Sequence, residues 1–152
     1  MAAPSTPTLK LLAQDAEDLK VMSAALQDAV GKVGDIAWEP QRRQLTVAVN
    51  RFRWELGGKK ERIRTAVQVG GVLGVKARKI RREAKRAVIE LLAITFEPGE
   101  APGGAVVFEF AGGADLRCEV ECLDVVLADV SKPWPAVAEP RHDIDPPAGT
   151  EL

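Results

Sequence analysis

The most regular alternation of apolar and charged side chains lies between Leu116 and Cys122. A period of two residues is typical of an antiparallel strand with one face buried and the other in solvent. The phase slips by one residue at Leu123, and apolar side chains then follow at every second position to Leu127. A β-bulge produces such a slip in a strand that bends around a core. The pattern therefore predicts one long bent strand over residues 116–129.

Part of this pattern occurs twice. Residues 36–40 and 94–98 share an isoleucine, an aromatic residue, a glutamate and a proline, and residues 63–69 resemble 116–122. Two copies of a hairpin followed by a bent strand would explain both matches, although any two antiparallel meanders resemble each other at this level. The predicted fold class is α+β, a mainly antiparallel β roll or barrel-like meander of about six to eight strands with one packed N-terminal helix. An internal duplication is left open.

One amphipathic helix is predicted near the N-terminus, after a short strand over residues 9–13. Asp15 is placed to cap this helix, and acidic residues follow in the first turn, where negative charge suits the helix dipole. An apolar stripe at helical spacing is formed by Leu19, Met22, Leu26 and Val30. The stripe predicts a helix that packs on the sheet and ends at Gly31.

The first hairpin is predicted over residues 35–39 and 44–55, with a proline turn between its strands. In the second strand the apolar positions change parity near Asn50 and Arg51. A β-bulge at this point would keep every apolar side chain on the core face. Arg51 and Arg53 are then expected to face solvent.

Two structures fit residues 76–94. Helical spacing gives an apolar stripe under a very basic face, whereas in a β domain the same segment forms a strand, a basic turn and another strand. We favour the second structure, with strands over 72–80 and 88–97 and the basic turn over 81–86. The reason is that the repeated pattern requires a strand ending at Pro98.

Length and composition fit one domain, because 152 residues can bury a core without the help of a metal or a disulfide. We expect a flexible N-terminus over 1–8, a single α+β domain over 9–131 and a proline-rich tail over 132–152, with Trp134 anchoring the start of the tail. The first apolar run is too short for the core of a signal peptide or for a membrane span. This predicts a soluble cytoplasmic protein without a membrane partner.

Charge is segregated along the chain, although the net charge is only −1. Residues 42–86 contain 15 lysines and arginines against three acids, and residues 87–152 contain three against 13. Opposite charges on paired strands would cancel across the sheet, and we favour this interpretation. The alternative is a surface that binds an anionic partner, either a nucleic acid or an acidic protein. The members of this candidate anion-binding surface are Arg51, Arg53, Arg62, Arg64, Arg78, Arg81 and Arg82.

The same segregation bears on self-association. If the basic and acidic parts lay on opposite sides of one sheet, molecules would associate head to tail through complementary faces. Charges that pair within the sheet leave no such drive. We therefore favour a monomer, with weak self-association as the alternative.

Few residues are available for catalysis. His142 is the only histidine, and the chain has no tyrosine. Cys118 and Cys122 would lie about 13 Å apart on a strand, too far for a disulfide. The glycine-rich segment 70–76 lacks the lysine and hydroxyl positions of a phosphate loop. We therefore predict no catalytic residue, cofactor or metal site, and we expect a non-catalytic binding or protein-interaction module. An anion binder is the alternative, and a small-molecule enzyme has the least support.

Five segments carry a resemblance to a known family, namely residues 26–30, 34–40, 50–55, 91–104 and 119–134. With these segments the chain resembles a bacterial family of uncharacterised proteins, domain of unknown function 2948, over roughly residues 9–142. The resemblance implies a soluble bacterial protein. It transfers no activity, cofactor or catalytic residue, because none is assigned to the family.

Overall fold

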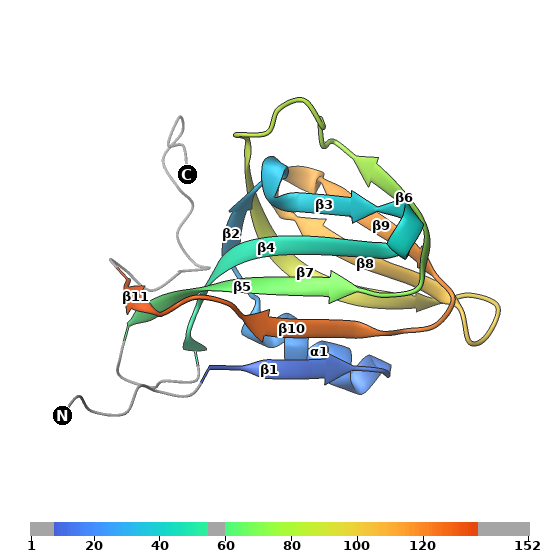
Figure 1. Cartoon of the computed structure of the whole chain (residues 1–152), viewed down its shortest axis with the longest axis horizontal. Coiled ribbons are helices and arrows are strands. Elements are labelled where there is room, and N and C mark those ends of the chain that lie inside the picture. The colour runs from blue at the N-terminus through green and yellow to red at the C-terminus, as the bar shows by residue number, and fades with distance from the viewer. Residues whose placement is uncertain (1–7, 55–59, 137–152) are drawn as a thin grey trace.

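The structure, a computed structural model, describes residues 8–54 and 60–136. In this part of the chain eleven strands form one antiparallel sheet that curls around its own core (Figure 1). The strands are β1 (Lys10–Ala13), β2 (Ala29–Lys32), β3 (Ile36–Glu39), β4 (Gln44–Phe52), β5 (Glu61–Val69), β6 (Val72–Arg78), β7 (Val88–Pro98), β8 (Gly104–Phe110), β9 (Asp115–Val120), β10 (Val125–Asp129) and β11 (Trp134–Pro135). The one α-helix of the described residues is α1 (Ala16–Ala25), and the short 3-10 turns are η1 (Val33–Asp35), η2 (Pro40–Arg42) and η4 (Ala111–Gly113).

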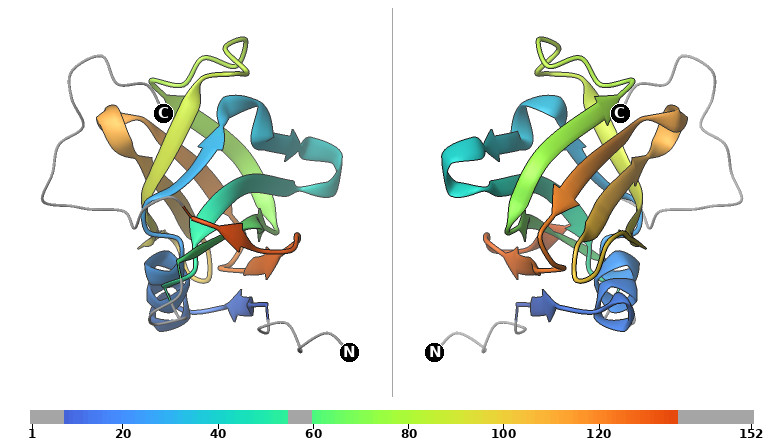
Figure 2. Two further views of the ribbon diagram at one scale, coloured as in Figure 1. Left: turned by 90° about the vertical axis from the view of Figure 1, so that its left-hand side faces the viewer. Right: turned by 90° about the vertical axis from the view of Figure 1, so that its right-hand side faces the viewer.

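The expected class, a mainly antiparallel sheet with one packed helix, is confirmed, but the described sheet has eleven strands rather than six to eight. Hydrogen-bonded neighbours follow the order β1-β10-β5-β4-β2-β7-β8-β9-β6, with β3 on β4 and β11 on β5. The two end strands do not pair with each other, so the sheet rolls up without closing. Figure 2 shows α1 at one end of the roll and the connection between β6 and β7 at the opposite end.

The helix begins where the sequence predicts, because the carboxylate of Asp15 accepts a hydrogen bond from the backbone N–H of Asp18 at 2.8 Å. The prediction that the helix continues to Gly31 is wrong. Asp28 has a left-handed φ of 63°, and the residues after it pair as β2 with β7. Hydrogen bonds to a strand far along the chain thus outweigh the local helical pattern.

Two antiparallel meanders make up most of the sheet: β3, β4 and β5 form one, and β7, β8 and β9 form the other. The strand after each meander crosses to the other one, so that β6 pairs with β9 and β10 pairs with β5. An internal duplication would produce this shared order, and it stays a prediction.

The single bent strand predicted over residues 116–129 is wrong. This segment forms β9 and β10, which lie in different parts of the sheet and are separated by a turn at residues 121–124. The phase slip at Leu123 marks the point where the chain crosses between meanders. Cys122 is consequently exposed on the turn, whereas Cys118 is buried.

Residues 76–94 adopt the favoured structure of strand, turn and strand. β6 ends at Arg78 and β7 begins at Val88, and residues 79–87 between them, most of which are exposed, are called the basic connection below. Two backbone hydrogen bonds of 3.0 Å, from Ala84 N to Arg81 O and from Ala87 N to Ala84 O, shape its turns.

The core fills the inside of the roll. Side chains at alternate positions of each strand point inward, as the period of two requires, and α1 adds the inward side of its stripe. Fully buried members of this core include Leu19, Met22, Leu45, Val47, Val49, Val67, Phe108, Cys118, Val125 and Leu127.

The sheet extends past residue 131, where we expected the tail to begin. In β11 Trp134 pairs with Arg62 and Pro135 with Glu61. Trp134 keeps 37% of its surface exposed. Residues 1–7 and 137–152, on which the expected N-terminus and most of the expected tail fall, lie outside the described residues. No helix among the residues described is long and apolar enough to cross a membrane.

Candidate functional site

The curled sheet is open between β3 and β6. Within the described ranges β3 pairs only with β4, and β6 pairs only with β9, so each strand has one unpaired edge. Backbone hydrogen bonds tie the two sides together at both ends: Val72 N donates to Arg43 O at 2.8 Å, and Gly34 N donates to Lys85 O at 2.9 Å. We call the opening between these two ties the slit.

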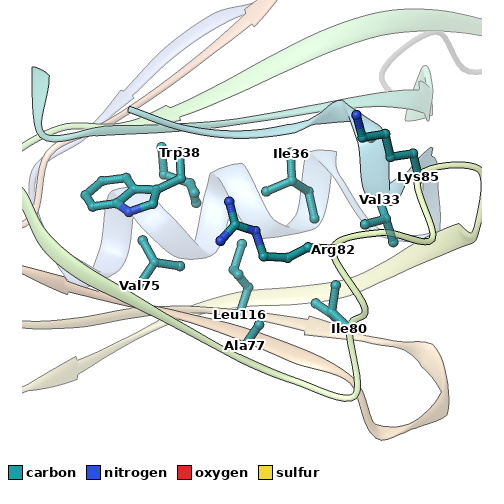
Figure 3. Close-up of a pocket in the computed structure, with 11 residues that line it drawn as sticks. Val33, Ile36, Trp38, Val75, Ala77, Ile80, Arg82, Lys85 and Leu116 are labelled. Atoms are coloured by element: carbon teal, nitrogen blue, oxygen red, sulfur yellow. The ribbon is translucent and has the colours of Figure 1, made fainter. Parts of the chain in front are cut away.

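The slit leads into a cavity of about 440 Å³. One wall comes from η1 and β3, and the facing wall comes from β6 and β9 (Figure 3). The apolar side chains that line it are Val33, Ile36, Trp38, Leu45, Val75, Ala77, Ile80 and Leu116. The alternation of each strand directs these side chains toward the cavity, because residues two apart share a face. The result is an apolar pocket that opens to solvent.

Two cations, Arg82 and Lys85, lie at the slit, and both belong to the basic connection. Figure 3 shows the guanidinium of Arg82 over the cavity, between the wall of Ile36 and the wall of Leu116, with Lys85 beside Val33 at the rim. In the part of the chain that the structure describes, neither cation forms an ion pair with a carboxylate. The slit therefore combines apolar walls with positive charge at its mouth.

Arg51 and Arg53 do not face solvent, which corrects the prediction that they belong to an exposed surface. The pairing of β4 with β5 runs from Leu45 to Phe52 without a register shift, so the expected β-bulge is absent. Arg51 therefore keeps the inward parity of the strand and is 0% exposed. Arg53 is 1% exposed, and its Nη1 lies 3.2 Å from Oε2 of Glu61.

Arg51 forms a buried ion pair with Asp129 at the end of β10. Its Nε and Nη2 donate to the two carboxylate oxygens at 2.9 and 2.7 Å. Thr65 Oγ1 and the backbone N–H of Leu9 donate to the same carboxylate, each at 2.7 Å. Burial alone would raise the pKa of Asp129, but these hydrogen bonds hold it below its ordinary value. The cluster joins β4, β5, β10 and the start of β1, which is a structural role.

Arg62 and Arg64, on β5, are also engaged within the fold. Both donate to Asn50 at 3.3 Å, Arg62 to the backbone oxygen and Arg64 to the side-chain oxygen. Arg64 Nη2 also lies 3.0 Å from Asp35. Burial lowers the pKa of Arg62, and two neighbouring carboxylates oppose that shift.

Arg78, Arg81 and Arg82 are the exposed members of the predicted surface. Arg78 pairs with Asp115 on β9, and Arg81 pairs with Glu83 at 3.3 Å. Arg82 is the one of the three that reaches the slit. The structure therefore distributes the seven predicted arginines over several environments instead of gathering them on one surface.

Charge cancellation across paired strands, the interpretation favoured from the sequence, stays a prediction, although Arg78 on β6 pairs with Asp115 opposite it on β9. The crossing of β6 and β10 between the two meanders brings basic residues beside acidic ones. The ion pairs that join residues 42–86 to residues 87–136 are Arg43–Glu121, Arg51–Asp129 and Arg78–Asp115. Lys85 and Arg82 form no such ion pair within the described ranges, and both lie on the basic connection, outside the sheet.

The two cysteines are both free, and they do not form a reactive pair. Burial raises the pKa of the Cys118 thiol to about 12, so this thiol stays protonated at neutral pH. Over the described ranges, no group of three or more His, Cys, Asp or Glu side chains could hold a metal ion. His142 lies outside the described residues.

The sequence pattern did not identify the slit. A period of two residues shows which side chains share a face, but it does not show whether a strand has a neighbour on its second edge. The one local signal was the density of cations over residues 76–86, where Glu83 is the only acid. That signal located the basic connection and not the apolar walls beside it.

Comparison with known proteins identifies a family without an assigned function. The model of the family described as "Protein of unknown function (DUF2948)" matches residues 9–142. No curated protein matches the chain. No solved structure matches it either. The slit therefore has to be interpreted from its own geometry.

Proposed function

We propose that this chain, which belongs to the family of proteins of unknown function DUF2948, is a non-catalytic binding module that holds a small, largely apolar ligand in the slit. The observation that carries the proposal is the apolar cavity of about 440 Å³ between two unpaired strand edges. The bacterial origin, the cytoplasmic location and the monomeric state expected from the sequence are part of the same proposal.

Apolar side chains form the walls of the slit, which is open to solvent. Covering apolar surface is favourable by about 25 cal/mol per Å², so a ligand that displaces water from these walls gains free energy. Small-molecule sites are mostly apolar clefts of roughly 300–1,000 Å³, and the volume of this cavity falls within that range. The two backbone ties at the ends of the slit support a site that is formed before the ligand arrives.

The test uses N-phenylnaphthylamine, a neutral apolar probe whose fluorescence rises when it leaves water. We expect saturable binding of one probe per molecule. Ala77, on β6, lines the slit, and Ala77→Phe should narrow the cavity and weaken binding. Ala37 is exposed on β3 and does not line the slit, so Ala37→Phe is the matched control and should keep the affinity of the wild type.

Two outcomes would reject the slit as the site. One is a wild-type protein that does not bind the probe. The other is an Ala77→Phe variant that folds, by circular dichroism, and binds as tightly as the Ala37→Phe control.

A second candidate function rests on the basic connection. It carries five cations, Lys79, Arg81, Arg82, Lys85 and Arg86, and one acid, Glu83. These cations are exposed at the end of the roll opposite α1, where a large anion could reach them (Figure 2). The candidate partner is a nucleic acid, with an acidic protein as the alternative.

Binding of short RNA and DNA at low ionic strength tests this second candidate. Affinity should fall steeply with added salt, because phosphate contacts release counterions. Replacing Lys79 and Arg86 by glutamine should weaken binding without touching the cations that line the slit. If neither nucleic acid binds at low salt, only the acidic-protein version is left, and pull-down from native cells would test it.

A further inference from the structure

Starting from the proposed function, we infer that the ligand of the slit carries a phosphate monoester head group on its apolar body. Arg82 is the main residue that would hold the phosphate, and Lys85 is the second. The inference rests on the slit being a binding site, and it adds the chemical class of the ligand.

Arg82 and Lys85 differ from the arginines of the paired strands in their ion pairs. Arg51, Arg64 and Arg78 each have a carboxylate partner within the fold. Arg82 and Lys85 form no ion pair within the described chain, although they stand at an apolar cavity. An anion at the mouth of the slit would supply the missing partner while its apolar part covers the walls.

The charge of the anion should match the two cations at the slit. Two cations from one short connection match two negative charges better than one. A phosphate monoester carries about −1.5 to −2 charges at neutral pH, and a carboxylate carries one. The planar guanidinium of Arg82 suits paired hydrogen bonds to phosphate oxygens. Lys85 lies at the rim beside Val33 (Figure 3), and its flexible side chain supplies the second positive charge at the slit.

The geometry also fixes the orientation of the ligand. The guanidinium of Arg82 lies over the cavity (Figure 3), while Leu45 and Leu116, which also line the cavity, are buried in the core. The phosphate should therefore stay at the mouth and the apolar body should point inward. Trp38 lines the same cavity, so a bound ligand should contact its indole ring.

The experiment measures displacement of N-phenylnaphthylamine by three ligands that share one apolar chain: octyl phosphate, octyl sulfate and octanol. We expect affinity to decrease in that order. Arg82→Gln should reduce the affinity for octyl phosphate by about tenfold or more and leave that for octanol unchanged. Lys85→Gln should give a smaller reduction. Arg81→Gln, which removes a neighbouring exposed arginine, is the matched control and should have little effect.

A pH series separates a dianion from a monoanion. The second pKa of a phosphate monoester is about 6, whereas a sulfate ester keeps one charge throughout. The affinity for octyl phosphate should therefore rise between about pH 5 and pH 7, relative to that for octyl sulfate. Among the described residues that line the slit there is no histidine, the side chain that ordinarily titrates in this range.

The outcomes distinguish this inference from the function on which it rests. Equal affinity for octanol and octyl phosphate, or an Arg82→Gln variant that keeps the phosphate preference, would overturn the inference and leave the apolar site intact. Loss of probe binding altogether would overturn both. Flotation with vesicles that contain phosphatidic acid, against vesicles of phosphatidylcholine alone, then identifies the source of the head group as a membrane lipid or a soluble phosphate monoester.

Discussion

Arginines in the paired strands and arginines in the basic connection meet different surroundings. On β4, Arg51 is enclosed and bonded to a carboxylate that lies 78 positions further along the chain. On the basic connection, Arg82 lies over an apolar cavity and forms no ion pair within the residues described. Both belong to the basic segment of the sequence, but Arg51 is buried and Arg82 is exposed.

The difference teaches that charge segregation along this sequence has two consequences. Where the chain stays in the sheet, the crossing of β6 and β10 sets basic residues beside acidic ones, and their charges cancel. Where the chain leaves the sheet between β6 and β7, no strand supplies the acids. The following predictions test this division by making equivalent changes in both regions.

The largest effect is expected from Asp129→Ala, which leaves Arg51 buried without its bidentate partner. Removing one side of a buried ion pair costs about 3–5 kcal/mol, and urea unfolding would measure the loss. The equivalent change in the basic connection is Glu83→Ala, which removes the partner of Arg81. That pair is exposed, so its loss should change the free energy of unfolding by less than about 0.5 kcal/mol.

A double variant shows how much of the cost comes from the buried charge of Arg51. Arg51→Met combined with Asp129→Leu removes both charges and should recover part of the stability that Asp129→Ala loses, since Thr65 and the backbone N–H of Leu9 still lose their acceptor. If Asp129→Ala and Glu83→Ala lowered the free energy of unfolding by similar amounts, the paired strands and the basic connection would not differ as we propose.

The free energy of unfolding should depend on pH through Asp129, because the pKa of this carboxyl is held below the ordinary value of 3.8. A lowered folded pKa stabilises the fold above the unfolded pKa, and this contribution is lost as the pH falls through the folded pKa. The difference in stability between the wild type and Asp129→Asn should therefore be constant from about pH 5 to 7 and shrink below about pH 4. Urea unfolding over this range would measure it, and a difference that grows in acid would contradict the role of the cluster.

An intermediate effect is expected from Thr65→Val, which removes one of the hydrogen bonds to the Asp129 carboxylate and keeps the shape of the side chain. A hydrogen bond to a charged group contributes about 1.5–3 kcal/mol, so the free energy of unfolding of the variant, measured by urea unfolding, should fall by an amount in that range. Thr46→Val, at a partly exposed position on β4, is the control and should be close to neutral. If both variants lost the same free energy of unfolding, the loss would come from packing in the sheet and not from the hydrogen bond to Asp129.

The smallest effect is expected from the ion pair between Arg78 and Asp115 on the outer face. Arg78 keeps 73% of its side chain exposed, so solvent screens the attraction. A double-mutant cycle with Arg78→Gln and Asp115→Asn should give a coupling energy of at most about 1 kcal/mol. A coupling energy as large as the cost of Asp129→Ala would mean that the buried and the exposed ion pair contribute equally to stability, which would contradict the account.

Much of the fold follows from local patterns. The cap at Asp15, the hairpin of β3 and β4, and the turn between β6 and β7 each depend on residues close together in sequence. The helix end could not be predicted this way, because Ala29 pairs with Leu91 on β7, which is distant in the sequence. The local sequence also did not show that the side chain of Arg51 points inward, because a guanidinium is buried only where a carboxylate pairs with it, and that carboxylate is distant in the sequence.

The candidate site was less predictable for a related reason. Arg82 was included in the basic segment of the sequence, but a sequence pattern does not show that β3 and β6 each pair with only one strand of the described sheet. The apolar walls come from residues as far apart as Val33 and Leu116. Only the folded sheet brings these walls together beneath Arg82.

The most direct test of the slit as a ligand site uses the three tryptophans of the chain. Trp38 lines the slit, whereas Trp54 and Trp134 do not. In a nitrogen–proton correlation NMR spectrum, saturating octyl phosphate should shift the indole N–H signal of Trp38 and leave the other two in place. An unmoved Trp38 signal in a protein that binds octyl phosphate would place the ligand elsewhere and contradict the assignment of the slit.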